Sequence, residues 1–239
     1  MNFLKLNDDK SEVIVFGAGR QLNNFNLRTF SVGLHEIEFK TCVKNIGALF
    51  DSEMSLKQQI SSIVKSGWYH LRRIWKVRHL LSCDQTTILV HAFIISRLDG
   101  NNCLLYGLSD KALQPLQKLQ NAAAKLIFNA RKFDHVTPIL KSLHWLPVKQ
   151  RILFKLLLLT FKCLNDLGPL YLAELISLYA PSRRLRSGSD GLLLTPCKAK
   201  TKFGDRSFCC AAPAEWNRLP LIIRSASSVS IFKGLLKDT

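Results

Sequence analysis

Apolar residues recur at intervals of three and four from Ser55 onward, and this spacing constrains the fold more than any other feature of the chain. Residues spaced in this way share one face of a helix, and that face is expected to pack against a core. Ser82 or Asp84 can accept hydrogen bonds at the start of the second helical stretch. The pattern predicts helices at 55–76, 82–100, 109–126, between Pro138 and Pro147, and at 148–164, 211–218 and 228–237.

The first fifty residues follow a different pattern. Short apolar runs bounded by turn residues predict strands at 13–16, 30–34, 36–39 and 43–50. Within the last of these, Gly47 indicates a bulge or a close approach of another backbone. We therefore expect a mainly α chain with a small N-terminal β piece, an α+β arrangement.

Composition divides the chain into four parts. Residues 1–53 form the β piece, and residues 54–180 form a helical domain. The stretch 181–206 is rich in Ser, Gly and Pro, which predicts a basic loop or linker. Residues 207–239 contain the two short helices that follow it.

The charge of the chain indicates the kind of partner it binds. Lys and Arg number 34 against 17 Asp and Glu, which gives a net charge of +17 at pH 7. Such a field favours RNA or DNA, because neutralising phosphates releases condensed counterions. A basic surface that has no polyanionic partner is the alternative. The hydrophobic fraction of 47% argues against an intrinsically disordered chain.

Two groups of cations are candidate nucleic-acid contacts. The first clusters within two turns of the first long helix, beside Tyr69, and comprises Arg72, Arg73, Lys76 and Arg78. The second lies in the loop and comprises Arg183, Arg184, Arg186, Lys198, Lys200, Lys202 and Arg206. Trp68 and Trp75 could stack on bases, but their seven-residue spacing places both on one face with Leu71, which favours the core.

No set of residues predicts a catalytic or metal site. Asp8 and Asp9 are adjacent carboxylates that could hold catalytic Mg²⁺, but a two-metal site needs a further carboxylate from another strand. Phosphate-binding, hydrolase and zinc motifs are absent from the sequence. We expect no catalytic residue, no metal ligand, no cofactor and no small-molecule substrate on this chain.

Cysteine usage and hydropathy bear on the compartment. The seven cysteines are an odd number in apolar contexts, which predicts free thiols in a reducing compartment. No apolar run is long enough for a signal peptide or a bilayer span. We expect an intracellular, soluble chain without a membrane partner, in either the nucleus or the cytoplasm.

Several blocks follow one another in an order that covers essentially the whole chain. They are LNDDKSEVIVFG at 6–17, VKNIGALFD at 43–51, FIISRLD and LLYG at 93–107, QKLQNAAAK at 117–125, HWLP at 144–147 and APAEWNRLP at 212–220. Each block alone is weak, whereas the succession is specific. Together they resemble the reverse transcriptases of non-LTR retrotransposons (LINE elements), especially those of the jockey and chicken-repeat type.

The resemblance implies a fold and roles for particular residues. Residues 1–53 would be the end of a polymerase palm, and the helical bundle that follows would be thumb-like. Lys10 matches a lysine placed near the phosphates of the incoming nucleotide. Lys44 and Gly47 match a hairpin that holds the primer end. Cys103 lies where relatives have Tyr-Cys-Asn, and this chain departs from that pattern.

The resemblance also implies what the chain lacks. Family members carry their metal-binding aspartates, including a Phe/Tyr-x-Asp-Asp hairpin, before the block that begins this sequence. Mg²⁺ would therefore belong to the intact polymerase, and the missing palm and fingers would be a partner of this chain. As it stands, the chain is not expected to be an enzyme.

We accordingly predict a truncated fragment of a transposable-element RNA-directed DNA polymerase that retains general RNA and DNA binding. A second hypothesis is that the sequence is a truncated record of an active reverse transcriptase. A third is a non-enzymatic helical interaction protein, and a fourth is a relic without a selected function.

Overall fold

The computed structural model describes residues 7, 10–24, 28–32, 35–131, 133–180, 191–196, 201 and 203–237. Contacts divide the chain into two units, residues 1–65 and residues 66–239. The sequence suggested a division at 53/54, but the observed one falls within helix α2 (Lys57–Val77). The C-terminal helices, expected as a separate part, belong to the second unit.

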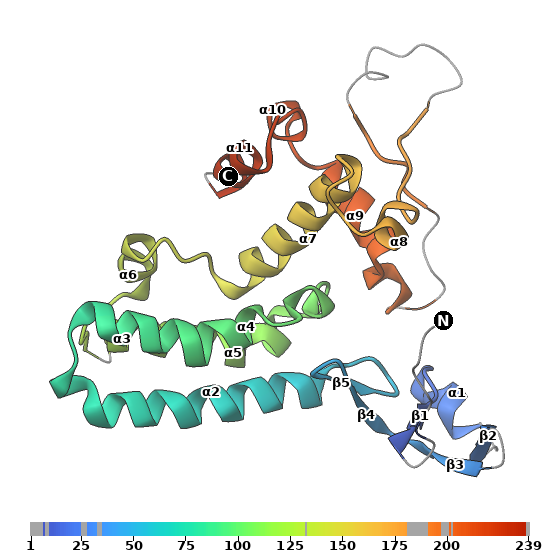
Figure 1. Ribbon diagram of the computed structural model, residues 1–239, viewed down its shortest axis with the longest axis horizontal. Helices are drawn as coiled ribbons and strands as arrows, with labels where there is room; N and C mark the ends of the chain where they lie inside the picture. The colour runs from blue at the N-terminus through green and yellow to red at the C-terminus, as the bar shows by residue number, and fades with distance from the viewer. Residues whose placement is uncertain are drawn as a thin grey trace. The chain divides into compact units, whose positions relative to one another are not determined.

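The N-terminal unit contains short strands and one short helix. These are β1 (Val13–Ile14), α1 (Gly19–Asn23), β2 (Thr29–Val32), β3 (His35–Lys40), β4 (Cys42–Asn45) and β5 (Ala48–Asp51) (Figure 1). Strand β3 pairs in parallel with β1 and antiparallel with β2, while β4 and β5 form a separate antiparallel pair. The predicted fold class, mainly α with a small N-terminal β piece, is confirmed.

The segment 43–50 is a hairpin, and the prediction of one strand with a bulge is wrong. Ile46 and Gly47 have φ angles of 44° and 80°, which reverse the chain in a two-residue turn between β4 and β5. A Cβ placed on Gly47 would meet no atom within 4 Å. The glycine therefore supplies a backbone dihedral and does not serve a close backbone approach.

Asp51, at the end of β5, fixes the start of α2. Its carboxylate accepts the backbone N–H of Ser55 at 2.8 Å and that of Leu56 at 2.6 Å. The backbone N–H of Leu49 in turn donates to Gln59 Oε1 at 2.9 Å. The two bonds to Asp51 fix the backbone that leads into α2, and the bond to Gln59 ties the hairpin to the first turn of the helix.

The second unit is helical and contains the remainder of α2. Its further elements are η2 (Arg78–Leu80), α3 (Cys83–Val90), η3 (His91–Ile95), α4 (Ser96–Asp99), η4 (Asn102–Leu105), α5 (Asp110–Ile127), α6 (Val136–Ser142), α7 (Val148–Leu164), α8 (Leu170–Ala173), η5 (Gly204–Arg206), α9 (Phe208–Trp216), α10 (Leu221–Arg224) and α11 (Val229–Lys237). A helix is present at each position predicted from spacing, but the one expected between Pro138 and Pro147 begins two residues before Pro138 and ends at Ser142. The short α1, α8 and α10 are additions.

Serine side chains begin two of these helices as their sequence indicates. Ser82 Oγ accepts the N–H of Gln85 at 3.2 Å, and Gln85 Oε1 accepts the N–H of Ser82 at 2.9 Å, a reciprocal capping box at the start of α3. Ser109 Oγ accepts the N–H of Ala112 at the start of α5. Pro138 lies inside α6, in the first turn, where its missing N–H leaves no hydrogen bond unmade.

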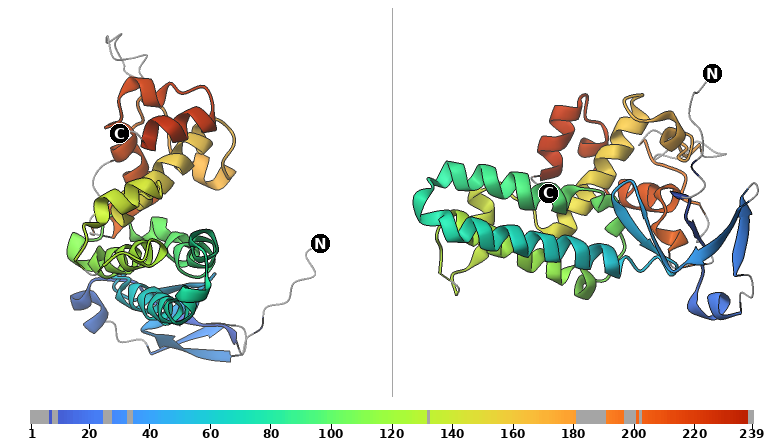
Figure 2. Two further views of the ribbon diagram at one scale, coloured as in Figure 1. Left: turned by 90° about the vertical axis from the view of Figure 1, so that its left-hand side faces the viewer. Right: turned by 60° about the horizontal axis from the view of Figure 1, so that its bottom comes forward.

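The core of the C-terminal half forms around α7. The ring of Phe161 stacks on that of Phe232 in α11 with centroids 4.4 Å apart, and the ring of Trp216 in α9 lies 5.9 Å from that of Phe232. Figure 2 shows these helices, coloured yellow to red, grouped at one side of α3 and α5. The very apolar helix at 148–164 is thus central to the core, as its composition predicts.

The stretch 181–206 is not a linker throughout. Leu193 is 2% exposed and belongs to the same core as Trp216. Asn217 holds its backbone, because Oδ1 accepts the N–H of Leu193 and Nδ2 donates to its carbonyl, both at 2.8 Å. Leu193 is the middle of three consecutive leucines, a run too short to show a helical or strand period, which explains why the sequence suggested only a loop.

Candidate nucleic-acid interface

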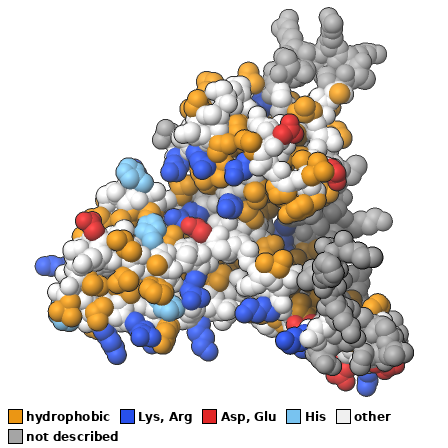
Figure 3. All heavy atoms as spheres, viewed as in Figure 1, with side chains coloured by type: hydrophobic (Ala, Val, Ile, Leu, Met, Phe, Trp, Pro, Cys, Tyr) orange, Lys and Arg blue, Asp and Glu red, His pale blue; other side chains and the backbone are white. Residues whose placement is uncertain are grey.

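The exposed side of α2 carries the cations that the sequence singles out. Arg72, Arg73 and Lys76 are all exposed. A helix turns about 100° per residue, so these three side chains and Tyr69 share the middle of one face, with Trp75 at one edge and His70 at the other. We call this set, Tyr69, His70, Arg72, Arg73, Trp75 and Lys76, the α2 face. Lys and Arg side chains lie along α2 at the lower edge of Figure 3.

Arg73 is held against the aromatic part of the α2 face. Its Nη1 donates to the hydroxyl of Tyr69 at 2.8 Å, and its Cζ lies 5.5 Å from the centroid of the Tyr69 ring. The tyrosine is 55% exposed, so one side of the pair is open to solvent. This arrangement orients a guanidinium beside an accessible ring, the combination used to bind phosphate and stack a base.

Two residues of the next helical stretch extend the α2 face. Phe93 stacks on His70 with ring centroids 5.0 Å apart and an interplanar angle of 16°. Arg97 Nη2 donates to His70 Nε2 at 3.4 Å. Burial, and then the charges of Arg97 and Arg73, lower the pKa of His70, which favours the neutral imidazole.

Sequence reasoning missed Phe93 and Arg97. The available signal was an aromatic residue and a cation four positions apart on an otherwise apolar helix, a spacing that places both on one side. Which side that is depends on packing against α2.

Trp75 is 69% exposed, and the prediction that it lies in the core is wrong. The buried positions in this part of α2 are Leu71 and Ile74, and Trp75 points about 100° away from Ile74. Trp68 is half-buried. Trp75 and Lys76 line a hollow of about 330 Å³ together with His79, so an indole and a cation face the same open space.

Arg78 has a structural role, in contrast to its neighbours on α2. Its Nε donates to the carbonyl of Leu126 at 3.0 Å, Nη2 to that of Ile127 at 2.8 Å, and Nη1 to that of Leu81 at 2.8 Å. Three of its five donors are therefore used on backbone carbonyls, two of them at the C-terminal end of α5. The sequence grouped Arg78 with the phosphate contacts; it lines the same hollow as Trp75 and Lys76, and these three bonds give it a structural role besides.

Lys10 and Lys44 are brought together in the N-terminal unit. Both line one groove of about 470 Å³ beside Glu12 and Phe50. Glu12 also binds Lys40, with the Lys40 Nζ 2.5 Å from Oε1, and this bond together with the charge of Lys40 lowers the pKa of the carboxyl. Gly47 does not line the groove, because it occupies the exposed turn of the hairpin.

The cations of the loop are placed only in part. Arg206 lies in η5, and its side chain passes so close to Gly107 that a Cβ there would lie 2.6 Å from Arg206 Cγ. Gly107 has a positive φ angle, and because it has no Cβ, the aliphatic part of the Arg206 side chain packs against its backbone. The remaining candidates, Arg183, Arg184, Arg186, Lys198, Lys200 and Lys202, lie outside the described residues.

Asp8 and Asp9, the adjacent carboxylates of the sequence, also lie outside the described residues. Within the described ranges, no three His, Cys, Asp or Glu side chains gather as a metal site would require. Nor does that part of the chain contain a helix long and apolar enough to cross a membrane.

Comparisons of the chain with protein-family models, with curated proteins and with solved structures found no match. The chemistry of the site therefore follows from the geometry of its own residues.

Proposed function

We propose that this chain binds RNA and DNA strands through the α2 face, as a thumb-like part of a protein related to non-LTR retrotransposon reverse transcriptases. The observation that carries the proposal is the exposed indole of Trp75 among the cations of α2. An exposed aromatic ring beside cations offers a surface on which a nucleobase can stack while the cations bind the neighbouring phosphates.

The chemistry of the α2 face suits the backbone of a strand and not a particular sequence. Phosphates can bind the guanidinium groups of Arg72 and Arg73 and the ammonium group of Lys76. Such phosphate contacts carry no sequence information. Tyr69 and Trp75 flank them with open rings that accept any base. The expected behaviour is sequence-tolerant binding that weakens with salt.

The experiment compares two double variants that lose the same charge. Arg72→Ala with Arg73→Ala removes two cations of the α2 face, whereas Lys118→Ala with Lys141→Ala removes two lysines of α5 and α6. Binding of a labelled RNA–DNA hybrid hairpin is measured by fluorescence anisotropy. We expect the first variant to bind about tenfold or more weakly and the second to bind like the wild type. Equal affinity in both variants would count against the proposal.

We further propose that this chain binds strands without extending them. The support is the resemblance, in which the metal-binding aspartates precede the block that contains Lys10. Purified protein mixed with a primed template, deoxynucleotides and Mg²⁺ is expected to leave the primer at its original length while the template is still bound. Magnesium-dependent extension would overturn this part of the proposal.

A further inference from the structure

A pocket separate from the α2 face lies between α7 and α11. It has a volume of about 350 Å³, and its lining includes Arg151, Phe154, Lys155, Lys233, Lys237 and Asn102. The carboxylate of Asp99 lines it as well. We call it the basic pocket. Its volume is within the range of small-molecule sites.

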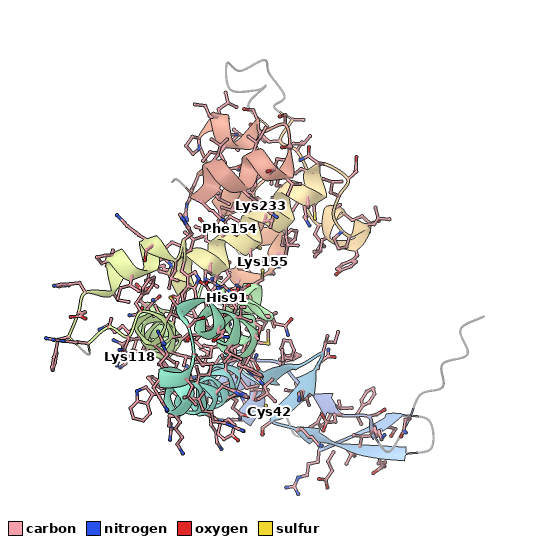
Figure 4. All side chains as sticks on the ribbon, turned by 60° about the vertical axis from the view of Figure 1, so that its left-hand side comes forward. Cys42, His91, Lys118, Phe154, Lys155 and Lys233 are labelled. Carbon is pink, nitrogen blue, oxygen red and sulfur yellow. The ribbon has the colours of Figure 1, made fainter. Side chains whose placement is uncertain are left out.

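The packing of two helices creates the basic pocket. Phe232 of α11 stacks on Phe161 of α7, which fixes the two helices against each other. Each helix then contributes a pair of cations four residues apart, Arg151 with Lys155 and Lys233 with Lys237. Figure 4 labels Phe154, Lys155 and Lys233 in this region, and Figure 3 shows Lys and Arg side chains gathered over α11 and the neighbouring part of α7.

Most of this positive charge is uncompensated. Arg151 is paired, because its Nη1 lies 2.6 Å from both carboxylate oxygens of Asp99. Among the described residues, Lys155, Lys233 and Lys237 have no carboxylate within 4 Å. Three ammonium groups around one pocket repel one another, and an anion bound between them would remove that repulsion.

The positive field reaches the pocket's surroundings. The charge of Lys155 favours the thiolate of Cys103, although burial outweighs it and raises the pKa of that thiol to about 11. The charge of Arg151 acts in the same sense on His91, where burial and then that guanidinium lower the pKa of the imidazole.

The pocket also contains features that a bare anion would not use. Asn102 is 5% exposed, and within the described part of the chain its Oδ1 has no hydrogen-bond partner. A buried acceptor left without a donor is uncommon and needs an explanation. Phe154 adds a half-buried aromatic ring to the lining.

From these features we propose that the basic pocket binds a nucleotide, either free or at the phosphorylated end of a strand. The lysines would bind the phosphates, the ring of Phe154 would contact the base, and the side chain of Asn102 would accept from a hydroxyl or amino group. A nucleotide combines the three chemistries in one molecule, whereas inorganic phosphate supplies only the first. The site is independent of the α2 face and does not require the proposed function to hold.

The test measures binding of ATP, AMP and inorganic phosphate by isothermal titration calorimetry. Lys233→Ala with Lys237→Ala should bind ATP about tenfold or more weakly, while the matched Lys118→Ala with Lys141→Ala should bind it like the wild type. Phe154→Leu should weaken AMP and leave phosphate unchanged. Absence of ATP binding by the wild type at about 1 mM, or equal binding by all variants, would overturn the proposal.

Two further experiments distinguish a free nucleotide from a strand end, and the basic pocket from the α2 face. A 5′-phosphorylated oligonucleotide that competes with ATP, where its 5′-hydroxyl form does not, identifies a strand end; failure of both to compete identifies a free nucleotide. Arg72→Ala with Arg73→Ala should keep full ATP affinity. Loss of ATP binding in that variant would contradict a separate pocket, whatever its effect on hybrid binding.

Discussion

The guanidinium of Arg78 donates from Nη2 to the backbone carbonyl of Ile127 at 2.8 Å, across 49 positions of sequence. The same side chain bonds the carbonyl of Leu126, so the first residue of η2 pairs with two carbonyls at the C-terminal end of α5. Arg73, only five residues earlier, is exposed and faces solvent. Two arginines in one basic run therefore act on different properties of the protein.

Arg78→Ala is expected to destabilise the fold and Arg73→Ala is not. Removal of Arg78 leaves two helix-end carbonyls without their donors, and we expect a loss of about 2 kcal/mol in the free energy of unfolding. Arg78→Lys should recover little, because an ammonium lacks the forked donors. Urea titration followed by circular dichroism measures both. An unchanged urea midpoint for Arg78→Ala would contradict a structural role for this side chain.

Replacing Gly67 with alanine should lower the stability of the fold, and replacing Gly234 with alanine should raise it. A Cβ on Gly67 would lie 2.3 Å from Cδ2 of Leu119, a side chain that is fully buried. We expect Gly67→Ala to destabilise by about 1–2 kcal/mol, because overpacking exceeds the gain in helix propensity. At Gly234 in α11 a Cβ meets nothing within 4 Å. Gly234→Ala should stabilise by about 0.5–1 kcal/mol. Shifts of the melting temperature in the same direction for both variants would contradict this packing.

Tyr106 should make stability depend on pH in the alkaline range. Its hydroxyl donates to Glu215 Oε1 at 2.6 Å, and burial, followed by that bond and the carboxylate charge, raises the pKa of the phenol above its usual value. A raised folded-state pKa stabilises the protein fully below about pH 10 and is lost as pH rises further. The stability difference between wild type and Tyr106→Phe should thus be constant to about pH 9 and shrink above about pH 10. A difference that grows with pH would refute the assignment.

Trp75→Leu is expected to impair strand binding without affecting the fold. The indole is mostly exposed, so its loss should leave the melting temperature unchanged. If it stacks on a base, affinity should fall by about 1–3 kcal/mol, and the tryptophan fluorescence quenched by the hybrid should be lost with it. Trp145 and Trp216 are buried and serve as internal references. Undiminished quenching in the variant would show that another indole contacts the strand.

Local signals in the sequence predicted most of the helical architecture. Ser82 and Ser109 cap helices at the positions that the spacing indicates, because capping is decided by residues three apart. The hairpin at 42–51 was predicted as one strand, because two residues with positive φ leave little trace when only one is a glycine.

The sequence predicted which residue types the candidate site contains, but not which of those residues bind a strand and which hold the fold together. Residue types alone grouped Arg73 with Arg78 and Trp75 with Trp68. Packing ties Arg78 to backbone carbonyls and leaves Arg73 exposed. It likewise half-buries Trp68 and exposes Trp75. The basic pocket gave no sequence signal, because Arg151 and Lys233 lie far apart in the sequence and meet only through the contact of Phe161 with Phe232.

The dependence of hybrid affinity on salt tests the central claim, strand binding by the α2 face, most directly. The logarithm of the association constant is measured against the logarithm of salt concentration for the wild type and for Arg72→Ala with Arg73→Ala. We predict a steep linear fall for the wild type and a slope smaller by about 1–2 for the variant, since each lost phosphate contact removes about 0.9. Salt-independent binding, or identical slopes for the two proteins, would contradict the account.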